Sequence, residues 1–242
     1  RKFFGTLYNT YSFFSLYANV DGFKNQDAEV PVQNRPEIDR WIISQLNSLI
    51  KEVDDCYNNY EPTRAGRAIS DFVTENLSNW YVRLNRKRYW GGEYNEDKIS
   101  AYQTLYTCLE TVSRLMAPIA TFYADQLFFD LNSVGGDKDI LSVHLADFPK
   151  YNHALIDLGL ESRMQVAQQI TSMILALRRK VSIKVRQPLT AIMIPAADED
   201  QQHQIQAVSN LILGEVNVKE IRFVDNTAGI LVKKIKPDFK KL

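Results

Sequence analysis

The residues best suited to bind a ligand lie in one short stretch, residues 79–90 (Asn-Trp-Tyr-Val-Arg-Leu-Asn-Arg-Lys-Arg-Tyr-Trp). The stretch holds four cations and four aromatic side chains, with no acid among them. Cations neutralise phosphates and aromatic faces stack on unpaired bases, so this mixture suits single-stranded RNA. The alternative is a solvated helix end, where cations complement the negative end of the helix dipole. The RNA contacts predicted from these residues are Arg83, Arg86, Lys87 and Arg88, with Tyr89 and Trp90 open to stacking.

Two further basic clusters follow in the second half of the chain. Residues 162–197 contain six Lys or Arg and no Asp or Glu, and residues 231–242 hold five lysines against Asp238 alone. A chain of zero formal net charge can therefore still present a positive face. A helix C-terminus and a solubilising tail are the respective alternatives. From the first of these clusters we predict RNA contacts at Arg178, Arg179, Lys184 and Arg186.

The histidines and cysteines are scattered along the sequence, and no catalytic or metal site is predicted. His144, His153 and His203 form no metal-ligand spacing with one another or with Cys56 and Cys108. The sequence has no Gly-rich phosphate loop and no nucleophile elbow. We therefore expect no cofactor in this chain and two buried, reduced cysteines, as in a cytoplasmic protein.

Length and hydropathy allow a large folded core. The 242 residues are 45% hydrophobic, enough for one large domain or one large and one small domain. No apolar run approaches the roughly 18–20 residues that a membrane span needs. The chain starts, without Met, at Arg1-Lys2-Phe3-Phe4, which resembles a helix interior. We expect a piece of a longer protein that continues beyond Leu242.

Apolar residues at helical spacing predict a mainly α protein, with an elongated helix bundle over 1–188 and a small α+β appendage over 189–242. Helices are expected over 1–20, 34–59, 62–90, 95–132 with a kink at Pro118, and 158–182. After Pro188 we expect strands at 191–195, 218–224 and 230–235, the last two paired, and a helix over 199–213.

The apolar stripe of the 62–90 helix predicts where its buried part ends. At 100° per residue, Trp80 and Tyr81 lie on the core face, whereas Arg86 points away. The core should therefore end near Leu84 and leave Tyr89 and Trp90 beyond it. The aromatic-rich helix over 1–20 is apolar around much of its circumference and should be heavily buried.

Eight segments in order along residues 1–190 resemble the anticodon-binding helical domain of isoleucyl-tRNA synthetases. No single segment is decisive, but together they are specific to this family, whose leucyl and valyl relatives share the architecture. The segments are Asn-Thr-Tyr-Ser-Phe-Phe at 9–14, Tyr-Ala-Asn at 17–19, Asp-Arg-Trp-Ile at 39–42, Leu-Ser-Asn-Trp-Tyr-Val-Arg at 77–83, Asn-Arg-Lys-Arg-Tyr-Trp at 85–90, Met-Ala-Pro-Ile at 116–119, Ser-Val-His-Leu at 142–145 and Arg-Gln-Pro-Leu at 186–189.

The resemblance implies a fragment that recognises the anticodon stem-loop of an isoleucine-accepting tRNA. Four cations (Arg83, Arg86, Lys87 and Arg88) would hold its backbone, and Asn85, Tyr89 and Trp90 would read unstacked bases. The parent enzyme would attach isoleucine to tRNA, using ATP and Mg²⁺. Its catalytic signatures, of the His-Ile-Gly-His and Lys-Met-Ser-Lys-Ser types, are absent from this sequence.

The resemblance also implies partners and leaves alternatives open. The partners would be the tRNA and the catalytic and editing domains of the same chain, in a cytoplasmic monomer with no membrane contact. One alternative is the equivalent domain of a valyl- or leucyl-type synthetase. The other is a helical protein–protein scaffold, with which the zero formal net charge is compatible.

Overall fold

The computed structural model describes the chain except residues 1, 26–27, 134–139, 196–198 and 225–242. Two compact units divide it, the N-terminal unit Arg1–Leu158 and the C-terminal unit Gly159–Leu242. The prediction of a mainly α protein with a small α+β part is confirmed. We expected the bundle to reach residue 188, but the helix over 158–180 belongs to the C-terminal unit.

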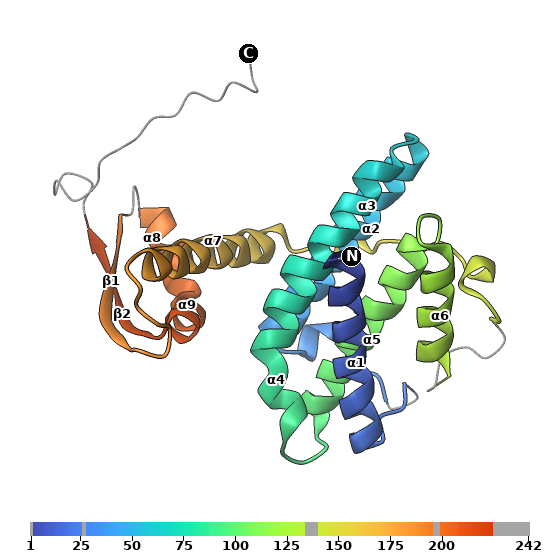
Figure 1. Cartoon of the computed structure of the whole chain (residues 1–242), viewed down its shortest axis with the longest axis horizontal. Helices are drawn as coiled ribbons and strands as arrows, with labels where there is room; N and C mark the ends of the chain where they lie inside the picture. The colour runs from blue at the N-terminus through green and yellow to red at the C-terminus, as the bar shows by residue number, and fades with distance from the viewer. Residues whose placement is uncertain (1, 26–27, 134–139, 196–198, 225–242) are drawn as a thin grey trace. The chain divides into compact units, whose positions relative to one another are not determined.

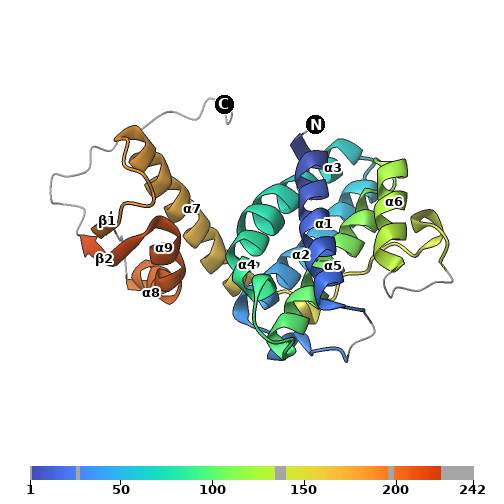
Figure 2. The same cartoon turned by 60° about the horizontal axis from the view of Figure 1, so that its bottom comes forward.

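The N-terminal unit is a helix bundle with one 3₁₀ turn between its first two helices and two more after its last described helix (Figures 1 and 2). Its core includes Leu7, Ile42, Val53, Leu105 and Leu109, each fully buried. The helices are α1 (Lys2–Asp21), α2 (Glu37–Asn58), α3 (Pro62–Asp71), η2 (Phe72–Val82), α4 (Arg83–Trp90), α5 (Glu96–Met116) and α6 (Thr121–Asn132); the 3₁₀ turns are η1 (Val32–Asn34), η3 (Val143–Leu145) and η4 (His153–Leu155).

A tight reversal joins α2 to the next helix. The amide of Glu61 donates to the Cys56 carbonyl at 2.8 Å, and the amide of Tyr60 donates to the Tyr57 carbonyl at 3.1 Å. This is the hydrogen-bond pattern of a Schellman motif, whose left-handed residue is usually glycine. Tyr60 occupies that position, with φ 58°. The reversal directs α3 and η2 back along α2, against which both pack.

The helix predicted over 62–90 exists, but its winding changes along its length. The segments α3, η2 and α4 run on without a break, and η2 is wound as a π-helix, with i→i+5 hydrogen bonds. Its buried residues are Phe72, Val73, Leu77, Trp80, Tyr81 and Val82. Because each π residue turns by less than 100°, the buried face of α4 differs from the face extrapolated from the sequence.

α5 is the central helix of the unit, and α1 is less buried than expected. Along α5 the buried residues include polar Thr104 and Ser113 as well as the apolar stripe. By contrast, α1 buries only Leu7, Thr10, Phe14 and Ala18, while Phe4, Tyr8, Leu16 and Val20 are exposed. The expectation of a heavily buried first helix was therefore wrong.

Two helix-boundary predictions also change. The expected helix over 95–132 is broken near Pro118 rather than kinked, because four non-helical residues, 117–120, separate α5 from α6. The helix expected from residue 34 begins at Glu37, with Pro36 as its N-cap. Asn95 caps α5 by accepting a hydrogen bond from the Lys98 amide at 3.0 Å.

The C-terminal unit combines helix α7 (Leu158–Lys180) with a two-stranded sheet. Strands β1 (Leu189–Pro195) and β2 (Val218–Val224) pair in parallel, with Leu189 opposite Val218 and Pro195 opposite Val224. The crossover between them holds α8 (Glu199–Ala207) and α9 (Ser209–Val216), so the expected 199–213 helix is two helices. The strand predicted at 230–235 and the lysine-rich tail lie outside the described residues.

Candidate nucleic-acid interface

One face of α4 presents a basic stripe with an aromatic end. Arg83, Arg86, Lys87 and Trp90 follow one another at spacings of i, i+3, i+4 and i+7, and all four are exposed. The Trp90 side chain is 57% exposed. Within the described part of the chain, Arg86 and Lys87 make no side-chain hydrogen bond or ion pair. We call these four residues the α4 stripe.

The opposite face of α4 is fixed to the bundle by Arg88. Its Nη1 lies 2.7 Å from Asp39 Oδ1, its Nη2 lies 3.0 Å from Asp39 Oδ2, and its Nε lies 3.0 Å from Asp97 Oδ2. Ser100 Oγ accepts a further hydrogen bond from Nη2 at 3.0 Å. Burial would lower the pKa of Arg88, but Asp39 and Asp97 outweigh it and hold this pKa above its usual value. Arg88 therefore joins α4 to α2 and α5, and its charge is neutralised inside the protein.

Two other predicted RNA contacts, Asn85 and Tyr89, also lie in the interior. Tyr89 is 1% exposed and donates from its hydroxyl to the Ala101 carbonyl at 2.9 Å. Asn85, 4% exposed, donates to the Tyr81 carbonyl at 2.8 Å and accepts from Arg88 at 3.0 Å. The expected end of the core near Leu84 was wrong, because the π-wound segment turns these residues inward. Trp80 and Tyr81 are buried, as predicted.

Asp39 is the residue of this network whose role the sequence analysis missed. It is fully buried and also accepts hydrogen bonds from the Tyr81 hydroxyl at 2.8 Å and from Ser100 at 3.2 Å. Burial and the negative charge of Asp39 raise the pKa of Tyr81 well above its usual value. The sequence signal for a buried carboxylate was the position of Asp39 at the start of an apolar stripe, close to Trp41 and Ile42.

In the C-terminal unit the predicted contacts again separate into one buried arginine and several exposed cations. Arg178 is 3% exposed and donates to the carbonyls of Lys184, Gln187 and Asn217 at 3.0–3.1 Å. By contrast, Arg179, Lys184 and Arg186 are exposed. These residues belong to a different unit from the α4 stripe.

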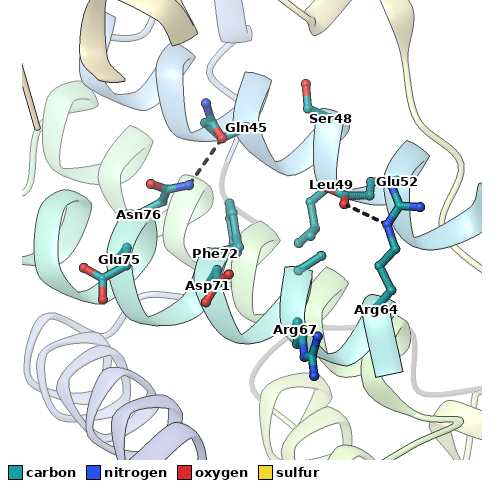
Figure 3. A pocket seen from close by; sticks show the side chains of 11 residues that line it. Gln45, Ser48, Leu49, Glu52, Arg64, Arg67, Asp71, Phe72, Glu75 and Asn76 are labelled. Atoms are coloured by element: carbon teal, nitrogen blue, oxygen red, sulfur yellow. Dashed lines mark hydrogen bonds and ion pairs between the residues drawn. The ribbon is translucent and has the colours of Figure 1, made fainter. Parts of the chain in front are cut away.

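A polar groove of about 380 Å³ lies between α2 and the α3–η2 helix (Figure 3). Gln45 and Asn76 join its walls by a hydrogen bond of 3.3 Å. Arg64, another lining residue, pairs with Glu52 at 4.0 Å and with Glu61 at 3.2 Å. Since Asp71 and Glu75 also line the groove, it offers little attraction to an anion.

The described residues contain no group of three or more His, Cys, Asp or Glu placed to hold a metal ion. Both cysteines are buried, and burial raises the pKa of the Cys108 thiol. Among the helices described, none is long and apolar enough to cross a membrane.

A helical bundle that exposes cations and a tryptophan along one rigid helix face has the features of an RNA-docking module. A family model for the anticodon-binding domain of tRNA ligases matches residues 39–193. The chain therefore belongs to the anticodon-binding domain family of tRNA ligases.

Curated relatives match the chain over its whole length. The chain is 70% identical over 242 residues to the isoleucine–tRNA ligase of Bacteroides thetaiotaomicron, 65% to that of Porphyromonas gingivalis and 60% to that of Cytophaga hutchinsonii. It covers 100% of its own length in each match but only 21–22% of each relative. The chain thus spans about a fifth of the length of these relatives.

Proposed function

We propose that this chain is the anticodon-binding part of an isoleucine–tRNA ligase and that the α4 stripe docks the anticodon stem-loop. The observation that carries the proposal is the geometry of α4. One face exposes Arg83, Arg86, Lys87 and Trp90, while Arg88 and Tyr89 fix the other face to the bundle. A binding surface on a helix held in this way loses little conformational entropy when RNA docks.

The residues of the stripe divide the work of recognition. Arg83, Arg86 and Lys87 would neutralise phosphates, which supplies affinity and positions the RNA without reading its sequence. Trp90 would stack on an unpaired anticodon base, as exposed aromatics do in single-stranded RNA complexes. Asn85, Arg88 and Tyr89, which the sequence analysis assigned to direct contact, would act by holding α4 in place.

Isoleucine is favoured over valine and leucine because the cited relatives, at 60–70% identity, are isoleucine–tRNA ligases. The whole protein would attach isoleucine to its tRNA in the cytoplasm, as a monomer. ATP and Mg²⁺ would be bound by the catalytic part, which lies outside the fifth of the relatives that this chain matches. Correct docking of the anticodon would orient the acceptor end toward that part.

The test removes Arg86 and Lys87, the two cations of the stripe that make no side-chain hydrogen bond or ion pair with a described residue. Arg86→Ala with Lys87→Ala should weaken binding to isoleucine tRNA and flatten the plot of log affinity against log salt by roughly 1.4–1.8. Arg64→Ala with Arg67→Ala is the matched control, because both arginines are exposed on the same continuous helix but line the acidic groove. An unchanged salt slope in the first variant would contradict the assignment.

A further inference from the structure

We propose that the loop after α7, residues 181–187, is a second, preformed surface for the phosphodiester backbone of RNA, one that does not read sequence. We call it the clamped loop. The proposal rests on the proposed function, because it takes the bound partner to be the same tRNA. It assigns to the C-terminal unit a contact of its own, independent of the α4 stripe.

Hydrogen bonds from Arg178 and Asn217 hold the clamped loop in one conformation. Arg178 Nη1 donates to the Lys184 carbonyl at 3.1 Å and to the Gln187 carbonyl at 3.0 Å. The Asn217 side-chain amide donates to the Val185 carbonyl at 2.9 Å. Asn217 itself has φ 52° and is linked to Arg178 Nη2 through its carbonyl at 3.1 Å. Arg178 and Asn217 together therefore bind three carbonyls of a seven-residue loop.

This anchoring leaves the cationic side chains of the loop and its helix end in solvent. Lys184 and Arg186 on the loop, and Arg179 and Lys180 at the end of α7, are exposed. None of the four makes a side-chain hydrogen bond or ion pair with a described residue. No acid occurs between residues 162 and 197 of the sequence, so the loop and the end of α7 contribute only positive charge to the local field.

Arg178 adds to that field instead of cancelling it. Its hydrogen-bond partners are neutral carbonyl groups, and no carboxylate among the described residues pairs with it. Arg178 donates to the backbone carbonyl of Lys184, so a guanidinium without a paired carboxylate supports the loop that carries the exposed cations. A loop held in this way attracts a polyanion without the cost of ordering its backbone at the moment of binding.

The chemistry of the clamped loop favours the RNA backbone. Residues 154–202 contain no Phe, Tyr or Trp, so the loop and α7 offer no aromatic ring for a base such as Trp90 supplies. Val181 and Val185 are exposed beside the cations and would also suit a protein surface. We favour RNA because four exposed cations without an acid match a polyphosphate. A protein partner would show little salt dependence and is the outcome that the test below would expose.

The experiment measures tRNA binding by the 242-residue chain carrying Lys184→Ala with Arg186→Ala, at several salt concentrations. The affinity should fall at least about threefold at low salt, and the salt slope should flatten by roughly 1.4–1.8. The ratio of affinities for intact and anticodon-replaced tRNA should not change. Lys219→Ala, which removes an exposed cation from β2 in the same unit, should leave both affinity and slope unchanged.

The outcomes separate this inference from the proposed function. An unchanged slope, or a changed anticodon preference, in the Lys184→Ala, Arg186→Ala variant would overturn the clamped loop, whatever the α4 variants do. If these substitutions weaken binding while Arg86→Ala with Lys87→Ala does not, the clamped loop stands and the α4 stripe fails. Weakened binding of a protein partner with no change in tRNA binding would also overturn the proposal. Both substituted side chains are exposed, so an unchanged circular dichroism melting curve is the folding control.

Discussion

Arg88 in the N-terminal unit and Arg178 in the C-terminal unit are both turned into the protein from helix-end clusters of cations, but their partners differ. Arg88 binds two carboxylates, Asp39 and Asp97, together with Ser100. Arg178 binds three backbone carbonyls. The first arginine is electrically neutralised, whereas the second keeps its charge next to the surface.

This difference shows how a similar sequence pattern can serve two kinds of RNA contact. Around Arg88, two carboxylates compensate the charge of the arginine, and the three cations and Trp90 of the α4 stripe remain as the candidate RNA contacts. Around Arg178 the supporting residue is itself charged, and residues 154–202 contain no Phe, Tyr or Trp, which suits attraction without discrimination. Each cluster has one structural arginine, and the remaining cations are the candidate contacts.

The largest effect should follow from breaking the Arg88 network. Arg88→Ala leaves Asp39 buried without its charged partner, so the free energy of unfolding should fall by about 3–5 kcal/mol. Urea denaturation followed by tryptophan fluorescence measures this directly, since Trp41, Trp80 and Trp90 all lie in the N-terminal unit. Arg88→Met combined with Asp39→Asn should recover much of the loss. If the double variant is as unstable as the single one, an unpaired buried charge is not the cause.

Removing Trp90 should affect RNA binding without affecting stability. Trp90→Ala deletes an exposed ring, and the loss of base stacking should weaken tRNA binding by about 1–3 kcal/mol. The salt slope should stay that of the unsubstituted chain, because no phosphate contact is lost. Filter binding across a salt series tests both statements. A flattened slope would show that Trp90 supports the cations instead of stacking.

Arg178→Ala should cost less stability than Arg88→Ala, although both arginines are buried or nearly so. Three backbone carbonyls lose the donor that Arg178 supplies. Because the loop is at the surface, water can replace some of these hydrogen bonds, so the free energy of unfolding should fall by about 1–3 kcal/mol. Hydrogen exchange at the amides of Ile183 and Gln187 should accelerate, since both belong to the same loop. Arg178→Lys, which keeps the charge but not the planar fork, should also accelerate exchange while retaining more of the salt slope. Unchanged exchange in both variants would mean that the loop is held by other contacts.

Acid should weaken the N-terminal unit through its carboxylates. Burial would raise the pKa of Asp21, but hydrogen bonds from Lys98 at 2.6 Å and Tyr102 at 2.5 Å outweigh it and lower this pKa. Because the carboxyl pKa is lower in the folded than in the unfolded state, Asp21 stabilises the fold at pH values above the unfolded pKa. This stability is lost below about pH 4, as the pH falls through the folded pKa. Tryptophan fluorescence against pH measures the loss. Asp21→Asn should make the change shallower, and an unaltered curve would contradict the role of Asp21.

The positions of the helices and of the two described strands could be predicted from the sequence. Apolar spacing, and the prolines and glycines that end helices and strands, are local signals. The exposed cations Arg86, Lys87, Lys184 and Arg186 were also predictable, since no acid lies near them in sequence. The inward turn of Tyr89 and Asn85 could not be extrapolated from a 100° helix, because η2 is wound as a π-helix. The roles of Arg88 and Arg178 depend on Asp39 and Asn217, which lie 49 and 39 residues away.

The most direct test of the central claim compares two RNAs on two proteins. The unsubstituted chain and the Trp90→Ala variant are each titrated with isoleucine tRNA and with the same tRNA bearing a replaced anticodon. The proposed function predicts that the unsubstituted chain prefers the intact anticodon and that Trp90→Ala binds both RNAs more weakly, because a stacking face is lost. Equal affinity of the unsubstituted chain for both RNAs, or undiminished binding by Trp90→Ala, would contradict docking of the anticodon on the α4 stripe.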